Sequence, residues 1–593
     1  MSIRTLADLI SVIASRHKPD ALLQKVGGRY EPISTAEFLT RILRLSKALA
    51  DSGIAPGDRV ALMAENGPHW PTIDFATIAK AGVLVPIYPT LLPDQAAYIV
   101  RDSGARMLFV QGRERLEGLL AKRAEMPSVE LIVSIDASAP GSEFTTLEAL
   151  YELGRDADPA EFDAGLKLAK PEDLATLIYT SGTTGDPKGV MLTHGNIVSN
   201  VVTGTQILEL KPEYVALSFL PLSHSFERTV DYCYFYCGCS IAYAESIQTV
   251  AQNIAEVKPH LFVAVPRVYE KVQAKVVETA SQGSALKQRI FNWAIGVGKQ
   301  AVSYRMREET PPGMLGVELA LADRLVFSKL RERLGGRLVF AISGGAPLSR
   351  DTAEFFWGAG IRIFEGYGLT ETSPVITVNA FRAAKLGSVG RPMAGIEVRI
   401  AEDGEILARG PNIMRGYFGK PEATAEVIDT QGWFHTGDIG QVDAEGFLAI
   451  TDRKKELIVN AYGKNIAPAP IENALKASRY LSQAVVIGDR RQYLCALLVP
   501  DFEALASWAA KQGVAGGPAE QIAHPKVREL VQHEVDSVNA GLARYEQIRA
   551  WELLPAEFTI ESGEITPTLK VKRRVINTKY GDLIERLYAG VEA

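Results

Sequence analysis

The sequence has little cysteine, no excess of basic residues and no long apolar run. Four cysteines among 593 residues agree with a reducing compartment. A formal net charge of −6 argues against a general nucleic-acid-binding protein, which needs a basic surface. The longest apolar stretches, such as "AGVLVPIYPTLL" from Ala81, are too short and too interrupted by proline to span a bilayer. The segment "MSIRTLADLISVIASRHKPD" predicts no signal peptide. We therefore expect a cytoplasmic protein that binds no nucleic acid.

Three of the four cysteines lie close together, at Cys233, Cys237 and Cys239 in "DYCYFYCGCS". This raises zinc as an alternative, because thiolates are common zinc ligands. The run is aromatic, however, and it has neither a paired CxxC motif nor histidines at ligand spacing, while Cys495 is distant in the sequence. The pattern therefore predicts buried free thiols rather than a metal site.

Hydrophobic residues make up 47% of the chain and charged residues 23%, as in ordinary globular proteins. At roughly 150 residues per domain, the chain has room for about four domain-sized units. Short β-branched runs alternate with helical stretches in the first half, which is typical of parallel sheets covered on both faces. These runs are "RVALMA" at Arg59, "GVLVPI" at Gly82, "RMLFV" at Arg106 and "ELIVSI" at Glu130, and similar runs follow later, "HLFVAVP" at His260 and "RLVFAISGG" at Arg337.

We therefore expect an α/β fold whose large N-terminal domain, residues 1–451, contains two doubly wound α/β subdomains. The pattern from about Ser281 to Leu334 is wholly helical and predicts an insertion. After Gly387, short strands with Gly and Asp-Gly turns predict a small β-barrel or meander. Residues 452–593 predict a separate, small and mobile α+β C-terminal domain.

The stretch "YTSGTTGDPK", Tyr179 to Lys188, places glycines, hydroxyls and one cation on a single loop between two apolar runs. Glycine lets backbone N–H groups converge, so such a loop fits the oxygens of a polyphosphate. A plain polar turn is the alternative. The P-loop pattern fails, because Lys188 is followed by glycine rather than Ser or Thr. The candidate phosphate-binding residues are Thr180, Ser181, Gly182, Thr183, Thr184, Gly185 and Lys188.

Further motifs follow in a fixed order: "ISGGAPLS" at Ile342, "EGYGLTET" at Glu365, "GWFHTGDIG" at Gly432, "DRKKELIVNAYGKNIAPAPIE" at Asp452 and "ITPTLKVKRR" at Ile565. Together with "YTSGTTGDPKGVMLTH", they resemble the motifs of the adenylate-forming superfamily. That superfamily contains acyl-CoA synthetases, non-ribosomal adenylation domains and beetle luciferases. The resemblance covers nearly the whole chain.

The resemblance implies a role for each matched residue in nucleotide binding. Tyr367 would stack on adenine, in a pocket shaped by Gly344, Gly345, Ala346 and Gly368. Thr370 would contact the α-phosphate, and Glu371 would hold Mg²⁺, which prefers oxygen ligands. Asp438 would accept the ribose hydroxyls, and Arg453 would contact ribose or phosphate. An ordinary surface ion pair is the alternative for Asp438 and Arg453.

The resemblance also implies roles in the C-terminal domain. Lys455 would be the hinge, and Gly463 would line the pantetheine tunnel of coenzyme A, where a side chain would block access. "PTLKVKR" resembles the terminal motif with its catalytic lysine, which selects Lys570 over Lys572. This chain has Leu569 where many members have glycine, a departure that puts the register of the motif in question.

"SFLPLSHSFERT", Ser218 to Thr229, resembles the variant found in long-chain fatty acyl-CoA synthetases, and the helical insertion points the same way. His224 and Phe226 would border the carboxylate end of an acyl pocket, with His224 among the catalytic residues. The aromatic run that follows, including Tyr234, would wall this pocket or belong to the plain core. Arg267 in "VPRVYEK" would contact phosphate or coenzyme A.

The resemblance thus implies a long-chain fatty acid–CoA ligase that forms acyl-AMP from ATP and then acyl-CoA, with Mg²⁺ as cofactor and coenzyme A as co-substrate. It leaves open peripheral contact with the inner face of the membrane and a homodimer. The alternatives are adenylation of a medium-chain or aryl carboxylate, transfer to an acyl carrier protein, a luciferase-like oxygenase, and a binding protein without turnover.

Overall fold

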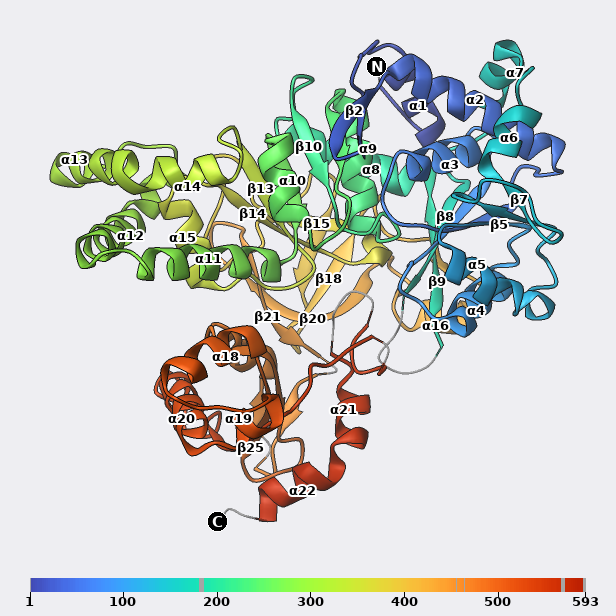
Figure 1. The fold of residues 1–593 in the computed structure, drawn as a ribbon. Coiled ribbons are helices and arrows are strands. Elements are labelled where there is room, and N and C mark those ends of the chain that lie inside the picture. Colours follow the sequence, from blue (N-terminus) through green and yellow to red (C-terminus); the bar gives the residue numbers. More distant parts are fainter. Residues whose placement is uncertain are drawn as a thin grey trace. The chain divides into compact units, whose positions relative to one another are not determined.

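The computed structural model describes residues 2–180, 186–454, 456–462, 464–560, 562–566 and 571–589. These residues form two compact units (Figure 1). The large unit comprises residues 1–399, 407–436 and 443–448, and the small unit comprises residues 400–406, 437–442 and 449–593. The main segment of the small unit therefore begins three residues before the expected start of the C-terminal domain at Asp452.

The first sheet of the large unit has nine strands in the order β16-β15-β14-β13-β12-β10-β11-β1-β2. Its central strands pair in parallel, and antiparallel pairs occur toward both edges. Its inner parallel strands, β10 to β13, are mostly apolar and buried, as the sequence predicts. The strands are β1 (Leu22–Val26), β2 (Arg29–Ile33), β10 (Val215–Ser218), β11 (Ser240–Tyr243), β12 (Leu261–Ala264), β13 (Phe340–Ser343), β14 (Ile363–Gly368), β15 (Val375–Val378) and β16 (Arg391–Pro392).

The second sheet of the large unit has eight strands in the order β19-β9-β8-β4-β3-β5-β6-β7. Strands β8 and β9 pair antiparallel, which confirms that the glycine-rich stretch links two strands. The two doubly wound sheets of the prediction are thus confirmed. The strands are β3 (Arg59–Met63), β4 (Val83–Ile87), β5 (Met107–Val110), β6 (Leu131–Ser134), β7 (Thr145–Thr146), β8 (Leu174–Thr180), β9 (Lys188–Thr193) and β19 (Gly416–Tyr417).

Helices of the large unit form where apolar residues recur at helical spacing. In α2 (Thr35–Asp51), the Ser34 side chain caps the first turn by accepting from Glu37 N, and Phe38, Ile42 and Leu45 are buried. The other helices are α1 (Leu6–Ala14), α3 (His69–Ile78), α4 (Pro93–Ser103), α5 (Arg113–Leu120), α6 (Leu147–Leu153), α7 (Pro159–Gly165), α8 (His194–Ile207), α9 (Ser225–Cys237), α10 (Val250–Val257), α11 (Pro266–Ser281), α12 (Ala285–Met306), α13 (Gly313–Ala322), α14 (Ser328–Arg333), α15 (Arg350–Gly358) and α16 (Pro421–Ala425).

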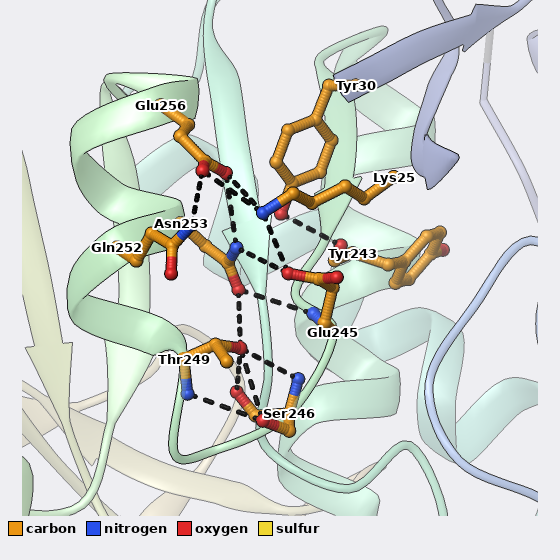
Figure 2. Close-up of polar contacts among 9 residues, drawn as sticks. All are labelled: Lys25, Tyr30, Tyr243, Glu245, Ser246, Thr249, Gln252, Asn253 and Glu256. Atoms are coloured by element: carbon orange, nitrogen blue, oxygen red, sulfur yellow. Dashed lines mark hydrogen bonds and ion pairs between the residues drawn. The ribbon is translucent and has the colours of Figure 1, made fainter. Parts of the chain in front are cut away.

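One polar network ties the edge of the nine-stranded sheet to α10 (Figure 2). The ammonium of Lys25 on β1 lies 2.8 Å from Glu245 and 2.8 Å from Glu256, and the Lys25 side chain is almost fully buried. Tyr30 on β2 donates to the carbonyl of Tyr243 at 3.2 Å. Because the lysine charge is matched by two carboxylates, this network stabilises the sheet edge.

The predicted helical insertion is confirmed and consists of α12, α13 and α14, with one π-helical turn, Asp323–Phe327, between the last two. Helix α13 packs against α12 at one end of the large unit, on the left in Figure 1. Within the described residues, no helix combines the length and the apolar composition that crossing a membrane requires.

The small unit has a three-stranded sheet, β24-β25-β26, and a core that includes Leu475, Leu498, Val527 and Val531. A four-stranded sheet of order β17-β18-β20-β21 occupies the region expected to be a small β-barrel. The strands of the four-stranded sheet are β17 (Glu397–Ile400), β18 (Glu405–Arg409), β20 (Phe434–Val442) and β21 (Leu448–Arg453). Those of the three-stranded sheet are β24 (Leu481–Ile487), β25 (Leu494–Pro500) and β26 (Ile548–Leu553). The short strands β22 (Ile458–Val459) and β23 (Asn465–Ile466) pair with each other.

The helices of the small unit include the one predicted from the valine periodicity, α20, whose Val527, Val531 and Val535 are buried. They are α17 (Pro468–Lys476), α18 (Phe502–Lys511), α19 (Pro518–Ala523), α20 (Pro525–Asn539), α21 (Arg573–Lys579) and α22 (Gly581–Ala589). Helices and a mixed sheet in one unit are the α+β arrangement that the sequence predicts.

Candidate functional site

The N-terminus of α9 brings the predicted acyl side of the site to the predicted phosphate side. Nδ1 of His224 caps the helix by accepting from Phe226 N at 3.1 Å, so a neutral ring carries its proton on Nε2. The next residue, Ser225, donates to Oγ1 of Thr370 at 3.4 Å. The residue after His224 therefore contacts Thr370, which lies 145 residues further along the sequence.

Phe226 packs directly against the loop predicted to shape the adenine pocket. A Cβ atom on Gly344 would lie 2.7 Å from Cε1 of Phe226, so only glycine allows this approach without a shift. Gly345 has φ +80°, a backbone conformation that favours glycine. Phe226 and Gly344 thus meet, while the roles predicted for them stay predictions.

Tyr367 and Gly368 end strand β14, where the pairing with β15 shifts register. Tyr367 is buried in this structure. A Cβ on Gly368 would lie 1.7 Å from the carbonyl oxygen of Pro374, so the backbones pack too closely here for any side chain. This close packing fixes the turn that leads into the short 3-10 helix η3 (Thr370–Thr372).

Glu371 in η3 and Lys188 on β9 both contact Tyr417, a residue that no motif of the sequence marks. The hydroxyl of Tyr417 on β19 donates to Oε1 of Glu371 at 3.0 Å. The ammonium of Lys188 lies 5.0 Å from the centroid of the Tyr417 ring, within the range of a cation–π contact. Burial and the neighbouring carboxylate raise the pKa of the Tyr417 phenol, so it remains a hydrogen-bond donor. Tyr417 lies in "MRGYFGKPEAT", a strand-and-turn pattern with no charge cluster to mark it.

Thr180 and Lys188 pair across the ends of β8 and β9. Several predicted residues lie outside the described part of the chain, so their roles stay predictions: Ser181, Gly182, Thr183, Thr184, Gly185, Lys455, Gly463 and Lys570. Ala346 is exposed beside Gly345, in the loop that follows β13.

Two predicted nucleotide ligands, Asp438 and Arg453, belong to the small unit. Nε of Arg453 lies 3.0 Å from Oδ1 of Asp438, and the Asp438 side chain is largely buried. The neighbouring Lys454 pairs with Glu405 at 2.9 Å and with Asp403 at 2.6 Å. Asp438 and Arg453 thus form the ion pair that is the alternative to nucleotide binding. This ion pair holds the carboxylate and the guanidinium close together.

Tyr234 of the predicted acyl pocket is buried within α9, and its hydroxyl has no hydrogen-bond partner among the described residues. Two buried carboxyl groups, Glu227 and Asp231, lie one helical turn apart on the same helix. Burial raises the pKa of both, that of Asp231 to about 7. Membership of Tyr234 in an acyl pocket stays a prediction.

The clustered cysteines form no disulfide bond in the described structure. Cys233 and Cys239 are buried, and Cys237 is half-buried. Burial raises the pKa of Cys237 to about 11 and that of Cys239 to about 12, which keeps both as thiols at neutral pH. Over the described ranges, no group of three or more His, Cys, Asp or Glu side chains is arranged to hold a metal ion.

Comparisons with known proteins match the sequence of this chain to one family. Residues 13–418 match the model of the AMP-binding enzyme family, and residues 455–592 match that of the AMP-binding enzyme C-terminal domain. The chain is 38% identical over 582 residues to the long-chain-fatty-acid–CoA ligase FadD15 of Mycobacterium bovis, covering 97% of this chain and 95% of that protein. It is 35% identical to the peroxisomal long chain acyl-CoA synthetase 7 of Arabidopsis thaliana, covering 95% and 83%.

Among solved structures, the adenylation domain of a carboxylate reductase from Mycobacterium chelonae is similar to this chain. The TM-score is 0.76 at 23% identity, and the match covers 99% of this chain and 91% of that one. At this identity the likeness shows a shared fold.

Proposed function

This chain belongs to the AMP-binding enzyme family, and we propose on that premise that it is an ATP-dependent ligase joining a long-chain fatty acid to coenzyme A. The fatty acid first reacts with ATP to give acyl-AMP and pyrophosphate, and coenzyme A then displaces AMP to give the thioester. The observation that carries the proposal is the contact between Ser225 and Thr370, which brings the acyl-side and phosphate-side motifs together. The names of the relatives supply the substrate class.

The first step needs positioning and charge neutralisation rather than a protein nucleophile. A carboxylate oxygen attacks the α-phosphorus, the bond from that phosphorus to the bridging oxygen breaks, and pyrophosphate leaves with the electron pair. In this proposal Thr370 donates to an α-phosphate oxygen, and Lys188 neutralises charge on the departing phosphates. His224, at the N-terminus of α9, lies at the carboxylate end of the acyl site.

Glu371 fits the proposed Mg²⁺ because its carboxylate offers hard oxygen ligands and one of its oxygens is already oriented by the Tyr417 hydroxyl. Proteins commonly hold Mg²⁺ with one or two carboxylates plus substrate phosphates, which is the set available here. The ion, when bound with ATP, neutralises charge on the phosphate oxygens.

In the second step the thiol of coenzyme A attacks the acyl carbonyl carbon, the carbon–oxygen bond to AMP breaks, and AMP leaves with the oxygen. The nucleotide must stay in place meanwhile. In this proposal Tyr367 stacks on adenine beside Gly344, and Asp438 accepts from the ribose hydroxyls with Arg453 at its side. Gly463 leaves room for the pantetheine arm.

Lys570 is proposed to serve the first step alone. Its cation would stabilise the charge that develops during adenylation, and losing one such group commonly costs on the order of 10²–10³ in rate. Lys570→Ala should therefore slow acyl-AMP formation by that factor, yet convert supplied acyl-AMP and coenzyme A to thioester at near wild-type rate. Lys572→Ala is the matched control. If Lys572→Ala shows the selective defect instead, the register at Leu569 is wrong.

A substrate panel tests the proposed function. AMP release is measured with acetate, octanoate, palmitate, oleate and benzoate, with and without coenzyme A. Burial of an aliphatic chain gains about 0.8 kcal/mol per CH₂, so kcat/KM should rise with chain length until the pocket ends. Acetate or benzoate as best substrate would contradict the long-chain assignment. Thioester formation only with a carrier protein would contradict coenzyme A as acceptor.

The outer face of α13 supports a further element of the proposal, peripheral contact with a membrane. Met314 and Val317 are 73% and 66% exposed, and Leu321 and Leu325 continue the same stripe at helical spacing. The inner face, with Leu315 and Leu319, packs against the core. An apolar stripe left open on a helix whose other face is already packed marks an interaction surface.

We propose an anionic lipid surface as the occupant of this stripe. Residues 285–337 contain ten Lys and Arg against five Asp and Glu, a net charge of +5 within a chain of net charge −6. Arg324, Lys329 and Arg333 are exposed along this segment and form no ion pair within the described part of the chain. Apolar side chains flanked by cations favour the interface of an anionic bilayer.

Flotation with phosphatidylcholine vesicles containing phosphatidylglycerol tests this surface. The triple variant Met314→Gln, Val317→Gln, Leu321→Gln should bind at least about tenfold more weakly than wild type. The matched control changes equally apolar exposed residues elsewhere, Leu153, Leu168 and Ile247, to Gln. Equal binding by both triples would refute the surface. A wild-type dimer in light scattering that the α13 triple dissociates would assign the stripe to a homodimer instead.

A further inference from the structure

Strand β19 is only two residues long, and backbone contacts fix it at the edge of the eight-stranded sheet. Tyr417 is paired with Val190 on β9. On either side of β19, Arg415 N donates to Met191 O at 3.0 Å and Phe418 N donates to Gly189 O at 2.8 Å. The backbone of Tyr417 is therefore held against the first residues of β9, directly after Lys188.

The segment that leads into β19 also holds the backbone of η3. Met414 N donates to the carbonyl of Glu371 at 2.8 Å. The amide of the buried Asn412 donates to the carbonyl of Thr372 at 2.9 Å. One segment, residues 412–418, is thus bonded to β9 on one side and to η3 on the other.

The side chain of Tyr417 contacts two oppositely charged groups. Its hydroxyl donates to Glu371 at 3.0 Å, and its ring lies 5.0 Å from the Lys188 ammonium. Within the described residues Lys188 forms no ion pair. A cation and a carboxylate on neighbouring elements would commonly pair directly, and each would then be less available to a ligand. Tyr417 instead contacts both groups, donating to Glu371 through its hydroxyl and facing Lys188 with its ring.

We infer that Tyr417 is a positioning residue that holds the Glu371 carboxylate for a nucleotide-bound divalent cation and the Lys188 ammonium for phosphate. The inference rests on the proposed function for the identity of the ligand. It assigns separate tasks to two parts of one side chain: the hydroxyl orients Glu371, and the ring orients Lys188.

Because ATP without a fatty acid has no acyl group to activate, its binding can be measured by calorimetry without turnover. The affinity for ATP is compared in EDTA and in excess Mg²⁺. Tyr417→Phe removes the hydroxyl and keeps the ring. It should leave the EDTA affinity unchanged and reduce the gain on adding Mg²⁺ by about tenfold, as for residues that orient a metal ligand. Tyr417→Leu, which removes both parts, should also weaken binding in EDTA.

Two controls separate positioning from a general packing role. Tyr30→Phe removes another hydrogen-bonded hydroxyl of the large unit, at 3.2 Å from Tyr243 O, and should change neither affinity. In a Glu371→Gln background, Tyr417→Phe should add no further loss, because the group that it orients is already gone. Circular dichroism melting establishes that Tyr417→Phe is folded.

A Tyr417→Phe protein with wild-type gain from Mg²⁺ would overturn the inference while leaving the proposed function intact. An additive further loss in the Glu371→Gln background would also overturn it. A wild-type protein that binds no ATP under either condition would refute the proposed function and the inference with it.

Discussion

Two polar clusters of the large unit are built in opposite ways. In the first, Arg228 on α9 is bound to both carboxylate oxygens of Asp74, at 2.5 and 3.0 Å, and also to Thr176 at 2.8 Å. Tyr232 donates to the same carboxylate at 2.5 Å, and the two charged side chains are 3% and 1% exposed. This cluster (Asp74, Thr176, Arg228, Tyr232) is closed, because each charge has a strong partner.

In the second cluster (Lys188, Thr370, Glu371, Tyr417), the contacts of Lys188 and Thr370 are longer and weaker. Ser225 reaches Thr370 at 3.4 Å, and Lys188 faces a ring at 5.0 Å rather than a carboxylate. Buried charges need full partners, whereas groups that bind a ligand must keep bonding capacity for it. We therefore expect changes in the closed cluster to lower stability, and changes in the open cluster to lower activity.

Asp74→Asn should produce the largest loss of stability. It leaves Arg228 buried without its carboxylate, and breaking a buried pair in this way costs roughly 3–5 kcal/mol. The transition of the large unit in urea, followed by tryptophan fluorescence, measures this loss. Glu117→Gln, which breaks an exposed pair with Arg113, is the control and should leave the transition unchanged. A transition in Asp74→Asn equal to wild type would show that the closed cluster is not structural.

Glu371→Gln should have the opposite profile. AMP formation with palmitate should fall about 10²–10³-fold, because a charged group that acts on the reacting phosphates is lost. The urea transition should stay at its wild-type midpoint, since the amide can still accept from Tyr417. A destabilised Glu371→Gln protein with normal turnover would contradict the division into a structural cluster and a functional cluster.

Gly344→Ala tests the packing that joins the acyl and nucleotide sides. The new Cβ would lie 2.7 Å from the Phe226 ring, and overpacking of this kind costs about 1–3 kcal/mol. Because the strain falls at the site, the KM for the fatty acid and for ATP should rise by about 5- to 100-fold. Gly296→Ala, at a helical glycine with open space around it, is the matched control. Unchanged KM values in Gly344→Ala would mean that Phe226 moves freely.

The buried pair Glu227 and Asp231 predicts a smaller, pH-dependent effect. Burial raises the pKa of Asp231 to about 7, while an unfolded aspartate titrates near ~4. Between these values the folded chain holds a proton that the unfolded chain has released. The free energy of unfolding should therefore fall as the pH rises toward 7, by about 1.4 kcal/mol per pH unit for each such proton.

Urea unfolding at about pH 5 and about pH 7 measures this fall. The double variant Glu227→Gln, Asp231→Asn has no carboxyl to protonate, so its stability should change less over this range than that of wild type. The same pH dependence in both proteins would show that these carboxyl groups titrate normally.

The sequence predicts the parts of this molecule whose pattern is local. Apolar runs such as "HLFVAVP" at His260 predict buried strands because a parallel strand is apolar on both faces. The spacing of Val527, Val531 and Val535 predicts α20 because those residues recur on one helical face. Motif resemblance brings Lys188, Thr370 and Glu371 to attention for the same reason, since each lies in a short ordered pattern.

Contacts between distant segments leave no such pattern. Tyr417 is 229 residues from Lys188 in the sequence, and only the pairing of β19 with β9 places its ring beside that lysine. Asp74 meets Arg228 because α3 packs near α9, which neither helix reveals alone. The exposed face of α13 is not predicted from the sequence for another reason. A helix that is apolar on all faces is expected to be buried on all sides.

Oxygen transfer is the most direct test of the central claim that this chain activates a carboxylate through an acyl-adenylate. Palmitate labelled with ¹⁸O in both carboxylate oxygens is incubated with the protein, ATP, Mg²⁺ and coenzyme A, and the products are examined by mass spectrometry. The proposed chemistry predicts palmitoyl-CoA and AMP in equal amounts, with a single ¹⁸O in each AMP, because the attacking carboxylate oxygen stays on the α-phosphorus. Unlabelled AMP, or ADP with labelled phosphate, would contradict it.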